Sequence, residues 1–326
     1  MNSRCLHVVF GAVLGLGAGL LTGTGADAQP YPSRPVKIIV PNPPGGATDT
    51  TSRIVGARLS ELFGQPVVVE NRPGSAGTLA NEVTAKASPD GYTIMLGQDS
   101  QIVINPYLYT TSTIEPLKDF VPVASLVTTV LILTVNPSLP VKDFHGFVEH
   151  ARHATPPLAY ASIGSGSQHH LAMEMLKMRA GINLVHVPYK GGGPAAAALI
   201  ANEVAAEFGG NSTASQVKQG VLRGLAVTSL KRDREFPDLP TIGDTYPGFE
   251  VTPWLGFFAP AGVPAPIIAK LHDTVNRVLT EPAVVARFEG GGMAPFVTTP
   301  AEFAAFIKAE DVKYRDIVKA VGARID

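Results

Sequence analysis

The sequence has almost no cysteine: its one cysteine, Cys5, falls within the first 28 residues. Those residues hold a basic start at Arg4, an apolar run over 8–21 and the small-residue pattern Ala26-Asp27-Ala28, which together indicate a signal peptide cleaved after Ala28. We therefore expect an exported protein that begins at Gln29 and contains no cysteine. That absence excludes disulfides, thiol catalysis and cysteine-based metal sites from the mature chain.

An excess of charge of either sign is also missing. The chain has 26 basic and 27 acidic residues and a net charge of −1, so it predicts no nucleic-acid partner. Beyond the leader no run of 18 uninterrupted apolar residues occurs, and we expect no stable membrane insertion.

Enzyme motifs are scarce as well. There is no Gly-x-Ser-x-Gly and no Walker loop, and residues 164–169 begin like a dinucleotide fingerprint but have His169 where the third glycine belongs. The sequence therefore predicts neither an enzyme nor a cofactor.

What the chain does contain is a β-α-β-α-β pattern that occurs twice, over residues 36–96 and 158–228. Such a pattern predicts two α/β lobes, each a mostly parallel sheet flanked by helices. The apolar segments 121–135 and 251–259 read as buried extended chain, and helices fill the C-terminal stretch. If those helices return to the first unit, the chain crosses twice and forms a hinge. We expect lobe 1 to comprise 29–128 and 254–326, and lobe 2 to comprise 129–253.

In each unit the first strand is followed by a Gly-rich loop and a helix start, at Pro43-Pro44-Gly45-Gly46 and at Gly164-Ser165-Gly166-Ser167. A helix N-terminus offers unpaired N–H groups and positive dipole potential, which suits an anion. Two such loops predict a small acid held between the lobes. The alternative is that Thr48, Asp49 and the serines only cap helices. The predicted ligand contacts are Asn42, Pro44, Gly45, Gly46, Thr48, Asp49, Ser100, Ser165, Gly166, Ser167, Gln168, His169, Tyr189 and Asn211.

Histidines and isolated basic residues raise further alternatives. His169 and His170 are adjacent on a helix and point about 100° apart, so even with His186 they make a poor ligand set, and we expect no metal. Lys190 and Arg72 could contact the ligand or be ordinary surface residues, and both options stay open.

Six motifs, in order along the chain, resemble the Bug-type solute-binding proteins of tripartite tricarboxylate transporters. They are residues 31–41, Pro43-Pro-Gly-Gly-Ala-Thr-Asp49, Val69-Glu-Asn-Arg-Pro-Gly-Ser-Ala-Gly77, Ser88-Pro-Asp-Gly-Tyr-Thr93, Val187-Pro-Tyr-Lys-Gly191 and Phe258-Ala-Pro-Ala-Gly-Val-Pro264. The resemblance covers essentially the whole mature chain. It implies a periplasmic, two-lobed protein of the type II-like binding-protein fold that delivers a small carboxylate to a membrane permease. We expect it to be a monomer.

The chain departs from the family's usual pattern at three places where ligand contact is implied. Asn42 stands where an aromatic residue is usual, His169 where a serine is common, and Gly209-Gly210-Asn211 where many members carry an acidic residue. Two other functions stay open at this point: presentation of the ligand to a membrane sensor, and an enzyme built on this scaffold.

Overall fold

The structure is a computed structural model that describes residues 31–74, 77–109 and 113–322. Residues 1–28 lie outside the described part, and with them the predicted cleavage site. The chain from Pro32 onward forms one compact unit. Within the described residues, no helix combines the length and apolar character needed to cross a membrane.

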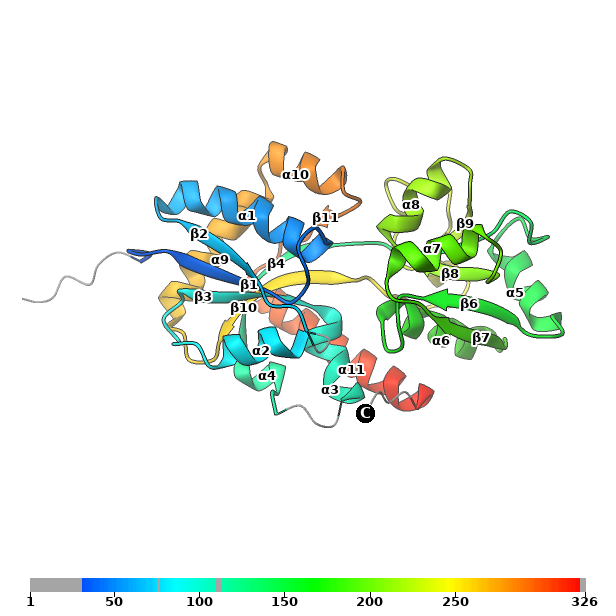
Figure 1. Ribbon diagram of the computed structural model, residues 1–326, viewed down its shortest axis with the longest axis horizontal. Helices are drawn as coiled ribbons and strands as arrows, with labels where there is room; N and C mark the ends of the chain where they lie inside the picture. Colours follow the sequence, from blue (N-terminus) through cyan, green and yellow to red (C-terminus); the bar gives the residue numbers. More distant parts are fainter. Residues whose placement is uncertain (1–30, 75–76, 110–112, 323–326) are drawn as a thin grey trace, which may run out of the picture. The chain divides into compact units, whose positions relative to one another are not determined.

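A six-stranded sheet gathers strands from both ends of the chain (Figure 1). Its order is β11-β4-β10-β3-β1-β2, with β1 parallel to β2 and β3, and with β10 antiparallel to β3 and β4. The strands are β1 (Val36–Val40), β2 (Val67–Asn71), β3 (Thr93–Gln98), β4 (Phe120–Thr128), β10 (Trp254–Pro260) and β11 (Ala294–Pro295).

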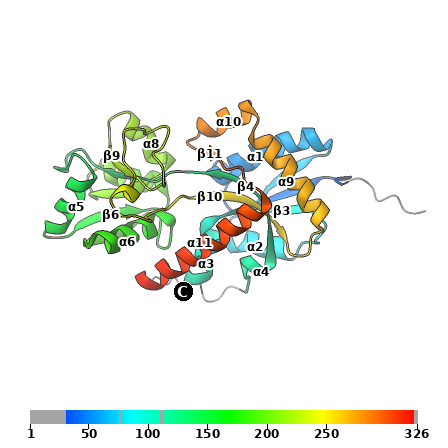
Figure 2. The same cartoon turned by 180° about the vertical axis from the view of Figure 1, so that it is seen from behind.

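Helices cover both faces of this sheet (Figures 1 and 2). On one face lie α1 (Ala47–Phe63), α9 (Ala265–Leu279) and α10 (Pro282–Glu289). On the other lie α2 (Thr78–Ala85), the π-helical turn η2 (Ser100–Ile104), α3 (Asn105–Leu108), α4 (Pro116–Asp119) and α11 (Pro300–Val321). α11 starts at a reciprocal capping box between Thr299 and Glu302, which satisfies donors that a helix start leaves free.

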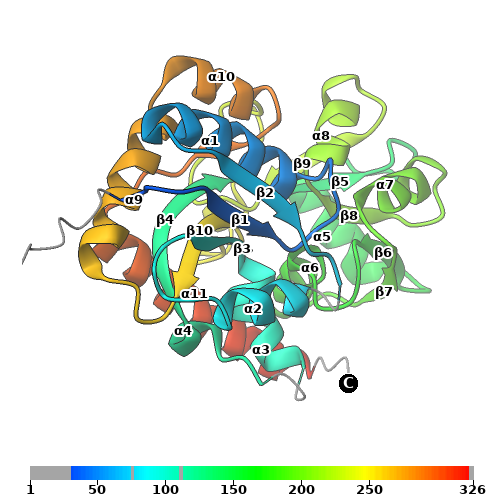
Figure 3. The same ribbon diagram turned by 60° about the vertical axis from the view of Figure 1, so that its left-hand side comes forward.

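A second, five-stranded sheet has the order β7-β6-β8-β5-β9. It comprises β5 (Ile132–Val135), β6 (Leu158–Ser162), β7 (Leu184–Pro188), β8 (Ala206–Gly209) and β9 (Arg223–Val227). Neighbouring residues of a strand point to opposite faces: Tyr160 joins a core with α5 (Phe144–His153) and α6 (Gln168–Ala180), whereas Ala161 packs with α7 (Gly192–Ile200). On the α7 side also lies α8 (Asn211–Lys218), and the turn η3 (Ile242–Asp244) follows β9. Figure 3 shows helices on both sides of this sheet.

The two sheets are mixed: the parallel strands expected from the two β-α-β-α-β patterns are present, and antiparallel strands are added to them. Each keeps three parallel strands, β2-β1-β3 and β7-β6-β8, and then adds an antiparallel strand, β10 or β5. β5 is the first strand that the chain forms in the second sheet after it leaves the first, and β10 is the first strand that it forms on its return. Each enters its sheet from the side of the other sheet and therefore runs opposite to the three parallel strands. The expected extended segment 121–135 is accordingly two strands, β4 and β5, in different sheets. The α/β architecture of two sheets connected by two crossings is as expected.

The two crossings run side by side, because the Thr129 N–H donates to the carbonyl of Pro253 at 2.9 Å. Directly after the second crossing, Trp254 is 1% exposed and packs edge-on against Phe303 and Phe306, each with ring centroids 5.8 Å away. The single tryptophan therefore anchors the start of β10 on α11. The lobe boundaries expected at 128/129 and 253/254 remain a prediction.

Candidate functional site

A pocket of about 510 Å³ lies where the loops after β1, β2, β3 and β6 converge. In the part of the chain that the structure describes, its lining residues include no Asp, Glu, Lys, Arg or His. They are Pro41, Asn42, Pro43, Pro73, Gly74, Gly77, Gln98, Ser100, Asn105, Tyr109, Ile163, Gly164, Ser165, Gly166, Ser167 and Gln168. An anion bound here would be stabilised by dipoles rather than by ion pairs.

The loop after β6 is built by hydrogen bonds to the start of α6. The Ser167 hydroxyl accepts the His170 N–H at 3.3 Å and donates to the Gly164 carbonyl at 2.6 Å. The Gly166 N–H donates to Nδ1 of His170 at 3.1 Å. Ser167 is therefore the helix cap that the alternative interpretation proposed, yet it also lines the pocket. The N–H groups of the first helical turn have no partner in a preceding turn and supply the positive end of the helix dipole.

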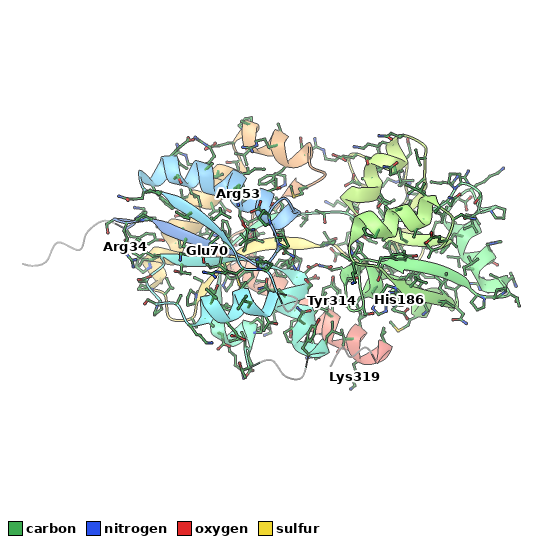
Figure 4. All side chains as sticks on the ribbon, in the orientation of Figure 1. Arg34, Arg53, Glu70, His186, Tyr314 and Lys319 are labelled. Atoms are coloured by element: carbon green, nitrogen blue, oxygen red, sulfur yellow. The ribbon has the colours of Figure 1, made fainter. Side chains whose placement is uncertain are left out.

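The loop after β1 is held from behind by Asp49. Its carboxylate accepts from the Gly45 N–H at 3.0 Å, from Nε of Arg53 at 3.0 Å and from Nδ2 of Asn71 at 3.0 Å. The hydrogen bond from Arg53 is the main cause that lowers the pKa of Asp49 to about 2, with help from Gly45 and Asn71. Figure 4 labels Arg53 on α1. Asp49 is therefore occupied in supporting the loop, and it does not line the pocket.

Asn42 and Ser100 are the other predicted residues that the fold brings to the pocket. Asn42 Oδ1 accepts from the Thr48 hydroxyl at 3.1 Å, and its backbone carbonyl accepts from Nδ2 of Asn71 at 2.9 Å. These bonds fix the side chain and leave its NH₂ group as the donor that it can offer to a ligand.

Seven further predicted residues are absent from the described pocket lining. Pro44, Gly45 and Gly46 are exposed on the loop after β1, whereas Thr48 is buried and its hydroxyl donates to Asn42. His169 is half-buried beside Gly210, where a Cβ would meet its Nε2 at 3.6 Å. Tyr189 packs against the apolar cluster of β6 and α7. Asn211 begins α8, and its side chain lies outside the described part.

Neither basic candidate lines the pocket. Arg72, which directly follows β2, donates through Nε to Glu70 at 2.5 Å and is therefore an ion-pairing residue, and Lys190 is exposed. Glu70 is labelled in Figure 4. Across the described ranges, no three His, Cys, Asp or Glu side chains are grouped as metal ligands would be.

Several lining residues escaped the sequence interpretation, notably Gln98, Gly77, Asn105 and Tyr109. The loop containing Gly77 follows β2, which is the parallel neighbour of β1, so the shared carboxyl edge of parallel strands could have indicated it. Asn105 and Tyr109 belong to α3 and its end, where no local signal points to a ligand.

At this pocket, a hydrogen bond between two side chains connects the six-stranded sheet and its helices to the five-stranded sheet and its helices. Nε2 of Gln168, the first residue of α6, donates to Oδ1 of Asp99, which follows β3. Burial raises the pKa of Asp99 to about 7, against the opposing effect of that hydrogen bond.

A second cavity, of about 520 Å³, is lined by residues 128–130 and 229–235, among others, next to the two crossings. It has charged walls with Lys231, Arg232 and Asp233, together with two ion pairs, Arg234 with Glu289 at 3.3 Å and Glu235 with Lys218 at 2.8 Å. It also lacks the Gly-rich loops. The pocket between the loops after β1 and β6 is therefore the candidate ligand site.

Comparison with known proteins identifies the family of this chain. Residues 51–323 match the family model described as the tripartite tricarboxylate transporter family receptor. The chain is 34% identical to Protein BugT of Bordetella pertussis over 328 residues, which covers 100% of both chains.

Two solved structures share the fold and carry organic acids. The R. palustris protein Rpa4515, solved with adipate, has a TM-score of 0.78 and 32% identity, and the match covers 90% of this chain and 100% of that one. MatC (Rpa3494) from Rhodopseudomonas palustris with bound malate has a TM-score of 0.73 and 31% identity, with coverage of 88% and 100%.

These matches confirm the resemblance drawn from the six motifs and exclude the enzyme alternative, because the family is one of transporter receptors. The chain thus belongs to the Bug-type periplasmic solute-binding receptors of tripartite tricarboxylate transporters.

Proposed function

We propose that this receptor binds a small organic acid in the pocket between the loops after β1 and β6, and delivers it to the membrane permease of a tripartite-type transporter. The observation that carries the proposal is the start of α6, whose capped, hydrogen-bonded loop opens into a pocket with neutral lining. The adipate and malate found with two structural relatives support the ligand class.

Recognition would come from backbone N–H groups, hydroxyls and amides. A carboxylate at a helix N-terminus gains about 0.3–1 kcal/mol from the dipole when exposed and up to about 2 kcal/mol when partly buried. Each hydrogen bond to the charged group adds about 1.5–3 kcal/mol. A few such contacts reach micromolar affinity, about −8 kcal/mol, without any ion pair.

The ligand would be enclosed when one lobe moves toward the other. We propose lobe 1 as 29–128 with 254–326 and lobe 2 as 129–253, because β4 ends at Thr128 and β10 begins at Trp254. Between these strands and the second sheet only the paired crossings around Thr129 and Pro253 need to bend.

Export to the periplasm with cleavage after Ala28, and function as a monomer, belong to the same proposal. The intact mass of the secreted protein should correspond to a chain that starts at Gln29. A mature protein that retains Met1 would contradict the cleavage.

Binding is tested by calorimetry and thermal shift with a panel of acids that includes adipate and malate. Ser165→Asp places a negative charge in the pocket at an exposed position, and it should reduce affinity at least tenfold while the protein stays folded. The matched control is Ser88→Asp, an exposed loop residue that precedes β3, at the opposite end of that strand from the pocket. If no acid binds, or if both variants bind equally well, the proposed site is wrong.

A further inference from the structure

Asp99 is a buried acid immediately behind the pocket. Its flanking residues Gln98 and Ser100 both line the pocket, whereas Asp99 itself is 1% exposed. Its Oδ1 accepts from the Ser100 N–H at 2.8 Å and from Nε2 of Gln168. Its other oxygen, Oδ2, is buried without a hydrogen-bond partner in the structure. Since Asp99 does not line the pocket, a ligand there can act on it through charge or through Gln168, which does.

The contact between Asp99 and Gln168 joins the units that would close on a ligand. Asp99 stands at the end of β3 in the first sheet, and Gln168 is the first residue of α6, which packs on the second. Gln168 also lines the pocket. Asp99 therefore connects the end of β3 to the N-terminus of α6 through this hydrogen bond.

The charged and titratable groups that face Asp99 come from α11. Glu310 raises the pKa of Asp99 and Lys313 lowers it, and both effects are smaller than that of burial. Tyr314 is also close, and the charge of Asp99 contributes to the raised pKa of its hydroxyl. Figure 4 shows Tyr314 on α11. Oε2 of Glu310 and the Tyr314 hydroxyl are, like Oδ2, buried without a partner. Lys313 forms its ion pair with Glu310 instead, and among the described residues no ion pair to Asp99 is present.

An anion in the pocket would act on this carboxyl as a nearby like charge. No charged side chain of the described lining stands between them, and a like charge disfavours ionisation. Because the pKa of Asp99 is already raised to about 7 by burial, protonation near neutral pH requires little work.

We propose that Asp99 is a positioning residue that holds Gln168 and the start of α6 at the pocket, and that it takes up a proton when an acid binds. The uptake of a proton on binding rests on the proposed function, whereas the positioning of Gln168 does not. That positioning concerns the ligand-free protein and can be measured in it.

The first measurement is a pH titration of the ligand-free protein labelled with ¹³C at its aspartate carboxyls. One resonance should titrate near neutral pH and be missing from Asp99→Asn. In Gln168→Ala its midpoint should move upward, because a donor to the ionised form is lost. Gln168→Ala changes a partly exposed side chain, so it remains informative if the Asn variant does not fold. A spectrum in which every aspartate titrates in the ordinary acidic range, or in which Gln168→Ala shifts none, would overturn the proposal.

The second measurement is calorimetry with adipate at pH 7.5 in buffers of different ionisation enthalpy. Wild type should take up a fraction of a proton per adipate, and Asp99→Asn should take up none while still binding. Affinity should fall as pH rises through 7, by about tenfold for each unit by which adipate raises the pKa of Asp99.

The matched control is Glu207→Gln. Glu207 is 3% exposed, and burial raises its pKa to about 7 as well, but it lies in β8 and does not line the pocket. Its replacement should leave the proton uptake unchanged. Binding of adipate by wild type without proton exchange would refute the linkage. Absence of any binding heat would instead count against the proposed function, and the NMR titration would then decide the role of Asp99 alone.

Discussion

His170 and His186 stack with ring centroids 4.0 Å apart and planes 14° apart, and both hold the loop that opens into the pocket. Nδ1 of His170 accepts the Gly166 N–H, so that nitrogen carries no proton. Nε2 of His186 lies 2.7 Å from the Ser162 hydroxyl, which also binds the backbone of Gly164. The pair, of which Figure 4 labels His186, is thus a support for the loop rather than a metal site.

This arrangement predicts a loss of stability in acid. Burial, followed by the charge of His170, lowers the pKa of His186 to about 4, and burial lowers that of His170. A histidine with a lowered folded-state pKa is more readily protonated when unfolded, so its contribution is complete above about pH 6.5 and is lost as pH falls toward 4. In His186→Gln, thermal melts should show a smaller decline over that window, by roughly 1–2 kcal/mol after allowance for solvent screening. The exposed His153→Gln should decline as wild type does, and an equal decline in His186→Gln would contradict the assignment.

Asn42→Phe should change which acids bind best. The substitution replaces an amide donor at the pocket with an apolar wall, and an aromatic contact contributes about 0.5–1.5 kcal/mol beyond its area. The ranking of acids should therefore shift by roughly tenfold. Asn42→Asp is the comparison variant, because it keeps the acceptor for Thr48 but should weaken every acid alike. If calorimetry finds the ranking unaltered in Asn42→Phe, residue 42 does not face the ligand.

Ser165 and Ser167 should separate binding from stability. Ser167 caps α6, and loss of such a cap costs about 1 kcal/mol, so Ser167→Ala should unfold at lower denaturant concentration. Ser165 is exposed and lines the pocket, so Ser165→Ala should keep wild-type stability within about 0.5 kcal/mol and lower acid affinity. Equal stability of the two variants in urea would show that the cap is not needed.

Gly97 is required where β3 passes β10. A Cβ at this position would lie 2.6 Å from Cδ2 of Phe258, so Gly97→Ala should cost about 1–3 kcal/mol through overpacking. In Gly193→Ala a Cβ meets nothing within 4 Å in the first turn of α7, and that variant should gain up to about 1 kcal/mol. Chemical denaturation of both variants measures these changes in the free energy of unfolding. A Gly97→Ala protein as stable as wild type would show that Phe258 can move.

The sequence by itself determined most of the local structure and the positions of the two Gly-rich loops. The β-α-β-α-β patterns over 36–96 and 158–228 and the Gly-rich turns carry their signals within a few residues, and the alternating strands and helices from β1 to β3 and from β6 to β9 fall within those ranges, apart from the end of β3 at Gln98. The loop 164–168 was predicted as an anion site for the same reason, and the structure brings all four of its candidate residues, Ser165 to Gln168, to the pocket.

Only the tertiary structure decided which polar residues face the pocket and which support it. Asp49 had the right type and place for a ligand contact, but Arg53 and Asn71 occupy it. Asp99 carried no local signal at all, because its importance comes from Gln168, 69 residues away. The antiparallel pairing of β5 and β10 could not be predicted from the sequence either, since the direction of each strand depends on which sheet the chain has just left. Pairings between distant segments are set by packing and burial over the whole fold, and no window of sequence contains them.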